Sequence, residues 1–115
     1  MITIYHNPRC RKSREALTLI QESGNQFKVR EYLKQPPTKQ ELSEVLALLN
    51  YRPLELIRKS ESVFKERYQG KQYSDDQWIE IMIENPILIE RPLVIKDQRA
   101  VLGRPSTAVN KLLNG

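Results

Sequence analysis

The chain has 115 residues, of which 39% are hydrophobic and 29% charged, so it is long enough for one hydrophobic core and too short for two independent ones. This composition excludes a disordered chain, and the single cysteine and single histidine exclude an internal disulfide and a structural zinc site. The net charge of +5 favours an anionic partner, which could be a small oxyanion, a nucleic acid or an acidic protein surface. Because the first residues contain no leader and no segment is long enough to span a membrane, we expect a cytoplasmic protein without membrane contact.

The first 35 residues predict a strand, a helix and a second strand. The alternation in Ile2–Tyr5 is typical of a short strand, which ends before Pro8. A helix follows, with an apolar face that includes Ala16 and Ile20, and the residues from Phe27 to Leu33 predict the second strand.

Residues 38–84 predict a helical block. It contains two capping boxes, at Thr38–Glu41 and Ser74–Gln77, and two shorter helices, at Pro53–Lys59 and Ser62–Tyr68. After this block, the chain returns to strands.

The last part of the chain predicts a hairpin and a helix. Leu93–Ile95 and Ala100–Leu102 flank a polar turn, and Pro105 is suited to the first turn of a final helix. We therefore predict an α/β fold that forms a single domain over residues 1–115. Its order is βαβ, a helical insertion over about 38–84, and ββα.

The stretch "HNPRCRKSR" places four cationic side chains around Cys10, at the corner between the first strand and the first helix. Cations at a helix N-terminus oppose the helix dipole, which makes this corner unfavourable unless a negative charge offsets them. A helix N-terminus and nearby cations can also lower the pKa of a thiol until the thiolate, the nucleophilic form, predominates. Cys10 is therefore predicted to be reactive, with an oxyanion as its counterpart.

Other polar residues are harder to interpret from spacing. His6 alone is best explained as a histidine at a strand end that packs or hydrogen-bonds, and Arg58, beside Lys59, as part of a salt-bridging helix face. Arg91 and Arg104 each precede a proline, which projects their side chains from a rigid corner.

Four separated motifs, "ITIYHNPRCRKSR", "LIRKSE", "NPILIERPLVI" and "LGRPS", together resemble the ArsC/Spx family of glutaredoxin-coupled arsenate reductases. The resemblance spans nearly the whole chain. It implies a thioredoxin-like fold with a helical insertion, which agrees with the order of elements predicted from the residues.

The resemblance also implies roles for individual residues. Cys10 would attack arsenate, Arg58, Arg91 and Arg104 would bind the oxyanion, and His6 would help to hold the thiolate. It also implies a cis peptide bond before Pro92, next to the active cysteine.

Ser13 occupies the position at which redox-switching Spx proteins have a second cysteine, and it would hydrogen-bond near the thiolate or cap the helix. Since the chain has no second thiol, an external one must resolve any Cys10 adduct. In this family, glutathione is the co-substrate and glutaredoxin reduces the resulting mixed disulfide. We expect no bound cofactor, no metal and a monomer.

The chain also departs from the arsenate-resistance enzymes. They have small neutral residues in place of Arg9, Arg11 and Lys12 and usually extend beyond the last helix, so the chain is more similar to a housekeeping branch of the family. The additional cations would suit the carboxylates of glutathione or an acidic partner.

Two alternative functions stay open. One is an Spx-like, non-enzymatic regulator that binds RNA polymerase, and the other is a general glutathione-linked thiol reductase. Three arginines converging on Cys10 would favour the enzyme. Direct binding to nucleic acid is not expected, since the sequence has no corresponding motif.

Overall fold

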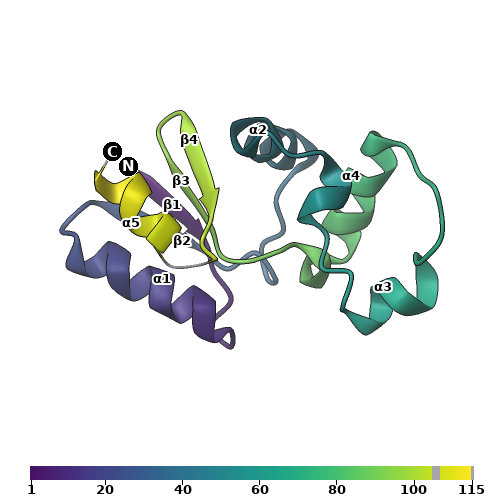
Figure 1. Cartoon of the computed structure of the whole chain (residues 1–115), viewed down its shortest axis with the longest axis horizontal. Coiled ribbons are helices and arrows are strands. Elements are labelled where there is room, and N and C mark those ends of the chain that lie inside the picture. Colours follow the sequence, from purple (N-terminus) through teal and green to yellow (C-terminus); the bar gives the residue numbers. More distant parts are fainter. Residues whose placement is uncertain (105–106, 115) are drawn as a thin grey trace. The chain divides into compact units, whose positions relative to one another are not determined.

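The computed structural model describes residues 1–104 and 107–114. The chain forms two compact units, Met1–Gln35 together with Arg91–Gly115, and Pro36–Glu90. Figure 1 shows the elements of each. The second unit includes the helical block that the sequence predicts.

The first unit consists of four strands and two helices among the described residues. They are β1 (Ile2–Tyr5), α1 (Arg11–Glu22), β2 (Phe27–Arg30), β3 (Leu93–Lys96), β4 (Arg99–Leu102) and α5 (Thr107–Asn114). This order confirms the predicted βαβ and ββα parts of an α/β fold.

The strands form one mixed sheet in the order β2-β1-β3-β4. β1 pairs in parallel with β2, whereas β1 with β3 and β3 with β4 are antiparallel. Parallel neighbouring strands are usually connected through a helix, and antiparallel ones through a tight hairpin. The hairpin turn between β3 and β4 includes Asp97, which has a φ of 55°.

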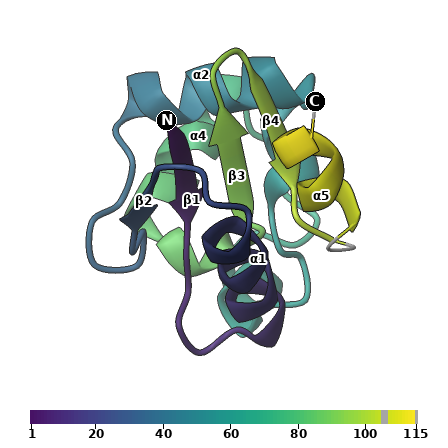
Figure 2. The ribbon, with the colours of Figure 1, turned by 90° about the vertical axis from the view of Figure 1, so that its left-hand side faces the viewer.

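One face of the sheet is covered by α1 and α5, which lie in front of it in Figure 2. The core contains side chains from both helices and from the two central strands, so helix packing fixes the positions of the strand ends. Its buried members are Ile2, Ile4, Ala16, Ile20, Val94, Val109, Leu112 and Leu113.

The second unit is helical. It contains α2 (Lys39–Leu49), the 3₁₀ helix η1 (Pro53–Leu56), α3 (Ser62–Arg67), α4 (Asp75–Glu84) and the 3₁₀ helix η2 (Pro86–Leu88). Both predicted capping boxes are confirmed. The side chains of Thr38 and Ser74 accept hydrogen bonds from the N–H groups of Glu41 and Gln77, and the side chains of Glu41 and Gln77 accept from the N–H groups of Thr38 and Ser74. None of the helices in the described residues is long and apolar enough to cross a membrane.

Some boundaries differ from the sequence prediction. β2 ends at Arg30, and residues 32–34 form a turn instead of continuing the strand, because the carbonyl of Glu31 accepts hydrogen bonds from Lys34 and Gln35. The helix predicted from Pro53 is a single 3₁₀ turn. The predicted role of Pro105 falls outside the described residues.

Candidate active site

The strand register brings three loops to the same end of the sheet. Tyr5 pairs with Leu93, and Leu93 pairs with Leu102. The segments that follow Tyr5, precede Leu93 and follow Leu102 therefore meet at one edge. These segments contain Cys10, Arg91 and Arg104.

Cys10 is the N-cap residue of α1 and is 8% exposed. Its N–H donates to the carbonyl of Asn7 at 2.9 Å, which closes the loop between β1 and α1. No acidic residue lies in the first turn of α1, so no carboxylate there competes for the positive end of the helix. The sulfur makes no capping hydrogen bond of ordinary geometry, although the backbone N–H of Ser13 favours its thiolate form.

Arg104 and Arg91 are the cations that interact with the sulfur. Nη2 of Arg104 lies 3.8 Å from Sγ of Cys10, within hydrogen-bond range for sulfur. Nε of Arg104 donates to the carbonyl of Arg91 at 2.7 Å, which links the two arginine-bearing loops. Hydrogen bonding and charge from the guanidinium of Arg91 also lower the pKa of Cys10. The peptide bond between Arg91 and Pro92 is cis, as the resemblance implies.

The pKa of Cys10 is below its ordinary value. Burial has the largest influence and favours the neutral thiol, which raises the pKa. The Ser13 N–H and the guanidinium groups of Arg91 and Arg104 act in the opposite direction and outweigh it. The nearby groups therefore stabilise the thiolate, the form that a nucleophile needs.

A buried polar network underlies the cysteine loop. Oγ of Ser13 lies 2.6 Å from Nδ1 of His6 and accepts a hydrogen bond from the N–H of Asn7 at 3.0 Å. Oδ1 of Asn7 accepts from the N–H of Arg9 at 3.0 Å. The hydroxyl and amide side chains thus fix the backbone that leads into Cys10, while the Ser13 N–H interacts with the sulfur.

The pKa of His6 is lowered, chiefly by burial, whereas Glu31 raises it and Arg14 lowers it. A neutral imidazole with Nδ1 unprotonated can accept a hydrogen bond from the Ser13 hydroxyl, while the oxygen of that hydroxyl accepts from the N–H of Asn7. His6 therefore reaches the cysteine loop through Ser13. We find no direct contact of His6 with sulfur among the described residues.

Of the four cations beside Cys10 in the sequence, three interact with groups other than the sulfur. Arg11 and Lys12 lie 3.2 and 4.0 Å from the carboxylate of Glu15. Arg14 donates to the carbonyl of Pro8 at 3.0 Å and thereby braces the loop. Arg9 is exposed, and its side chain has no partner within residues 1–104 and 107–114.

Arg58 belongs to the second unit. Its Nε lies 3.4 Å from Glu61 and 3.6 Å from Glu90, and its side chain is 17% exposed. The ion pairs expected from its spacing are thus present, but Arg58 is largely buried and lies between η1 and α3, not on a helix face.

Two residues near the site were not singled out from the sequence. Asn7 organises the cysteine loop, and its position before Pro8 is a signal for a side-chain-stabilised turn. Gly103 donates its N–H to the carbonyl of Pro92 at 2.8 Å, and a Cβ there would lie 2.8 Å from Cγ of Pro92. Glycine therefore permits the close approach of the two loops that carry Arg91 and Arg104.

The site has the groups of a thiolate nucleophile with cationic donors for an anionic reactant. The described residues contain no group of three or more side chains suited to hold a metal ion. The chemistry that these residues can provide is thus attack by sulfur on an anion held by guanidinium groups.

The comparisons agree with this geometry. Residues 5–112 match the profile of the ArsC family. The chain belongs to the ArsC family. It is 38% identical to "Arsenate reductase" of Escherichia coli K12 over 113 residues, covering 97% of this chain and 80% of that protein. It is also 38% identical over 114 residues to the E. coli "Uncharacterized protein YfgD", covering 97% of this chain and 96% of YfgD.

The solved structure "Arsenate reductase from Vibrio cholerae" has 38% identity and a TM-score of 0.90, with 96% of this chain and 95% of that chain covered. The ArsC assignment and the α/β, thioredoxin-like fold expected from the resemblance are thereby confirmed.

Proposed function

We propose that this ArsC protein reduces arsenate to arsenite, with Cys10 as the nucleophile. The observation that carries the proposal is the Cys10 sulfur, whose pKa is held below its ordinary value beside Arg91 and Arg104. Relatives named arsenate reductase at 38% identity support the choice of oxyanion.

Arg91 and Arg104 would hold the equatorial oxygens of arsenate while sulfur attacks arsenic. Their guanidinium groups donate in a planar fork that matches an oxyanion, and they also stabilise the added charge of the adduct. We assign Arg58 to the same task on the resemblance to the family. Its pairing with Glu61 and Glu90 orients its guanidinium group.

In the first step, the Cys10 thiolate forms a sulfur–arsenic bond and an arsenate oxygen leaves as water after protonation. In the second, the thiolate of glutathione attacks the Cys10 sulfur. The sulfur–arsenic bond breaks with its electron pair on arsenic, so that As(V) becomes As(III) and arsenite departs. Cys10 is left as a mixed disulfide with glutathione.

Glutaredoxin would then reduce this mixed disulfide and regenerate the Cys10 thiolate. The dependence on an external thiol follows from the single cysteine of the chain. His6 and Ser13 would tune the thiolate, since their network holds the backbone whose N–H faces the sulfur. Such a system requires the reducing, glutathione-containing cytoplasm.

The test is arsenate-dependent oxidation of NADPH in the presence of glutathione, glutaredoxin and glutathione reductase. We expect turnover by the wild type and none above background by Cys10→Ser, whose thermal midpoint should stay within a few degrees of wild type. Equal rates for both proteins would show that Cys10 is not the nucleophile. Turnover of a glutathione mixed disulfide but not of arsenate would replace the proposal with a general thiol reductase.

A further inference from the structure

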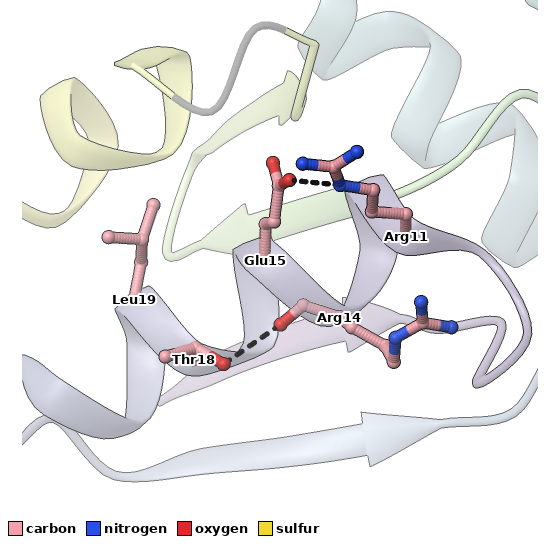
Figure 3. A pocket seen from close by; sticks show the side chains of 5 residues that line it. All are labelled: Arg11, Arg14, Glu15, Thr18 and Leu19. Carbon is pink, nitrogen blue, oxygen red and sulfur yellow. Dashed lines mark hydrogen bonds and ion pairs between the residues drawn. The ribbon is translucent and has the colours of Figure 1, made fainter.

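The outer surface of α1 carries a depression of about 410 Å³ that begins one residue after the cysteine. Its lining residues are Arg11, Arg14, Glu15, Thr18 and Leu19. Figure 3 shows these side chains along successive turns of the helix, with the two arginines in its N-terminal half and Leu19 toward the other end.

The charge of this surface is predominantly positive. Arg11, Lys12 and Arg14 are exposed, and the carboxylate of Glu15 pairs with Arg11 and Lys12. The side chain of Arg11 is 83% exposed even though it pairs with Glu15. Such a pair leaves the guanidinium largely available to an incoming carboxylate.

These cations are not needed to account for the lowered pKa of Cys10. The groups that lower the pKa of Cys10 are the Ser13 N–H, Arg91 and Arg104, and none of the cations of the depression is among them. Cations in the first turn of a helix also oppose its dipole. A surface that retains them beside the reactive thiol is suited to a negatively charged partner.

The length of the depression distinguishes between two such partners. From Arg11 to Leu19 the helix rises about 12 Å, at about 1.5 Å per residue. Glutathione, a tripeptide thiol with a central cysteine, reaches only about 7–10 Å from its sulfur to its two carboxylates. A partner whose thiol is at Cys10 can contact Leu19 only if it is a larger molecule.

We propose that the α1 surface formed by Arg11, Lys12, Arg14, Thr18 and Leu19 docks a thiol-bearing reductant protein that carries acidic side chains around its reactive cysteine. Its carboxylates would pair with the cations, and an apolar side chain would cover the partly exposed Leu19. This inference rests on the proposed function insofar as Cys10 forms a mixed disulfide during turnover.

The docked step is a thiol–disulfide exchange. The partner thiolate attacks the glutathione sulfur of the mixed disulfide, the bond to Cys10 breaks, and Cys10 leaves as its thiolate. The partner becomes glutathionylated, so two sulfurs exchange a bond without any further oxidant or reductant. The low pKa of Cys10 makes it a good leaving group in this step.

The experiment measures this step alone and needs no arsenate. Cys10 is converted to its glutathione mixed disulfide with oxidised glutathione, and the loss of the adduct is followed by mass spectrometry. The reductants are a net-negative glutaredoxin, glutathione and neutral dithiothreitol. Failure of arsenate turnover would overturn the proposed function and leave this measurement intact.

The test variant is Arg11→Gln combined with Lys12→Gln, and the control is Lys28→Gln combined with Lys111→Gln, on β2 and α5. Both remove two exposed positive charges from the first unit. At low salt, we expect the test variant to lower the glutaredoxin rate about fivefold to tenfold and to weaken its salt dependence, because charges near an interface act mainly on association. The dithiothreitol rate should stay within about twofold of wild type.

Other outcomes would overturn the docking surface. An equal loss in the control variant would mean that only net charge matters. An equal loss with dithiothreitol would mean that the disulfide itself had changed, and an equal loss with glutathione would assign the cations to a small thiol. An unchanged rate of reduction by glutaredoxin would show that the surface takes no part in the reaction.

Discussion

The cations near Cys10 in the sequence and the cations near it in space are different residues. Arg9, Arg11 and Lys12 surround the cysteine in the chain, yet they point to solvent or to Glu15. Arg104, 94 residues away, places Nη2 3.8 Å from the sulfur. The charges that stabilise the thiolate come from the ββα part of the first unit, whereas the local charges remain available to a partner.

The largest effect on activity is expected when one of the two distant arginines is removed. We expect Arg104→Ala and Arg91→Ala each to lower kcat/KM for arsenate by about a hundredfold or more, the usual effect of losing one preorganised donor to a reacting anion. Arg9→Ala is the matched control, because its side chain makes no hydrogen bond or ion pair with the described residues and takes no part in the proposed chemistry. Kinetics with varied arsenate would measure all three.

The same variants should change the pH dependence of Cys10 alkylation by iodoacetamide. A guanidinium beside the sulfur favours the thiolate, so its removal raises the pKa of Cys10 and moves the midpoint to higher pH. Alkylation at neutral pH then slows, while the limiting rate at high pH is unchanged. If Arg9→Ala moved the midpoint as far as Arg104→Ala, local charge would be the cause after all.

The sequence could predict local features because local chemistry determines them. The capping boxes at Thr38 and Ser74 depend on side chains three residues apart, and the end of β1 before Pro8 depends on one missing N–H. The predicted extension of β2 to Leu33 was wrong, because burial of Tyr32 does not require a strand. Tyr32 is fully buried from within a turn.

The meeting of Cys10, Arg91 and Arg104 could not be predicted from spacing. It depends on the pairing of Tyr5 with Leu93, and a shift of one residue would turn the side chains to the opposite face. Register is a tertiary property, which only the resemblance to the family could anticipate. The resemblance likewise pointed to His6 and Arg58, whereas Gly103 carries no local signal at all.

Gly103→Ala should have a smaller effect, on the stability of the protein and on the pKa of Cys10. The added Cβ would lie 2.8 Å from Cγ of Pro92 and 3.0 Å from Cγ2 of Val109, so the two loops must separate. Overpacking of this kind costs about 1–3 kcal/mol in the free energy of unfolding. We also expect the alkylation midpoint to rise, because Arg91 and Arg104 would move away from the sulfur.

Gly24→Ala provides the control for Gly103→Ala. Gly24 has a φ of +77° and no neighbour within 4 Å of an added Cβ. An alanine there costs about 1–2 kcal/mol in the free energy of unfolding through its backbone conformation alone. The pH midpoint of Cys10 alkylation should not change. Denaturation measures the stability of both variants. If the alkylation midpoint shifted equally in both variants, lost stability and not the spacing of the loops would be the cause.

The smallest expected effect comes from Glu15→Gln, which removes the carboxylate that pairs with Arg11 and Lys12. Exposed pairs of this kind contribute about 0.2–1 kcal/mol, so the free energy of unfolding should change little. The surface would become more positive, and a net-negative glutaredoxin should reduce the Cys10 mixed disulfide up to about threefold faster at low salt. Glu22→Gln, in the last turn of α1, changes the net charge equally but lies outside the depression, so it should leave the rate unchanged. A slower reaction with Glu15→Gln would mean that the partner binds the carboxylate and not the cations.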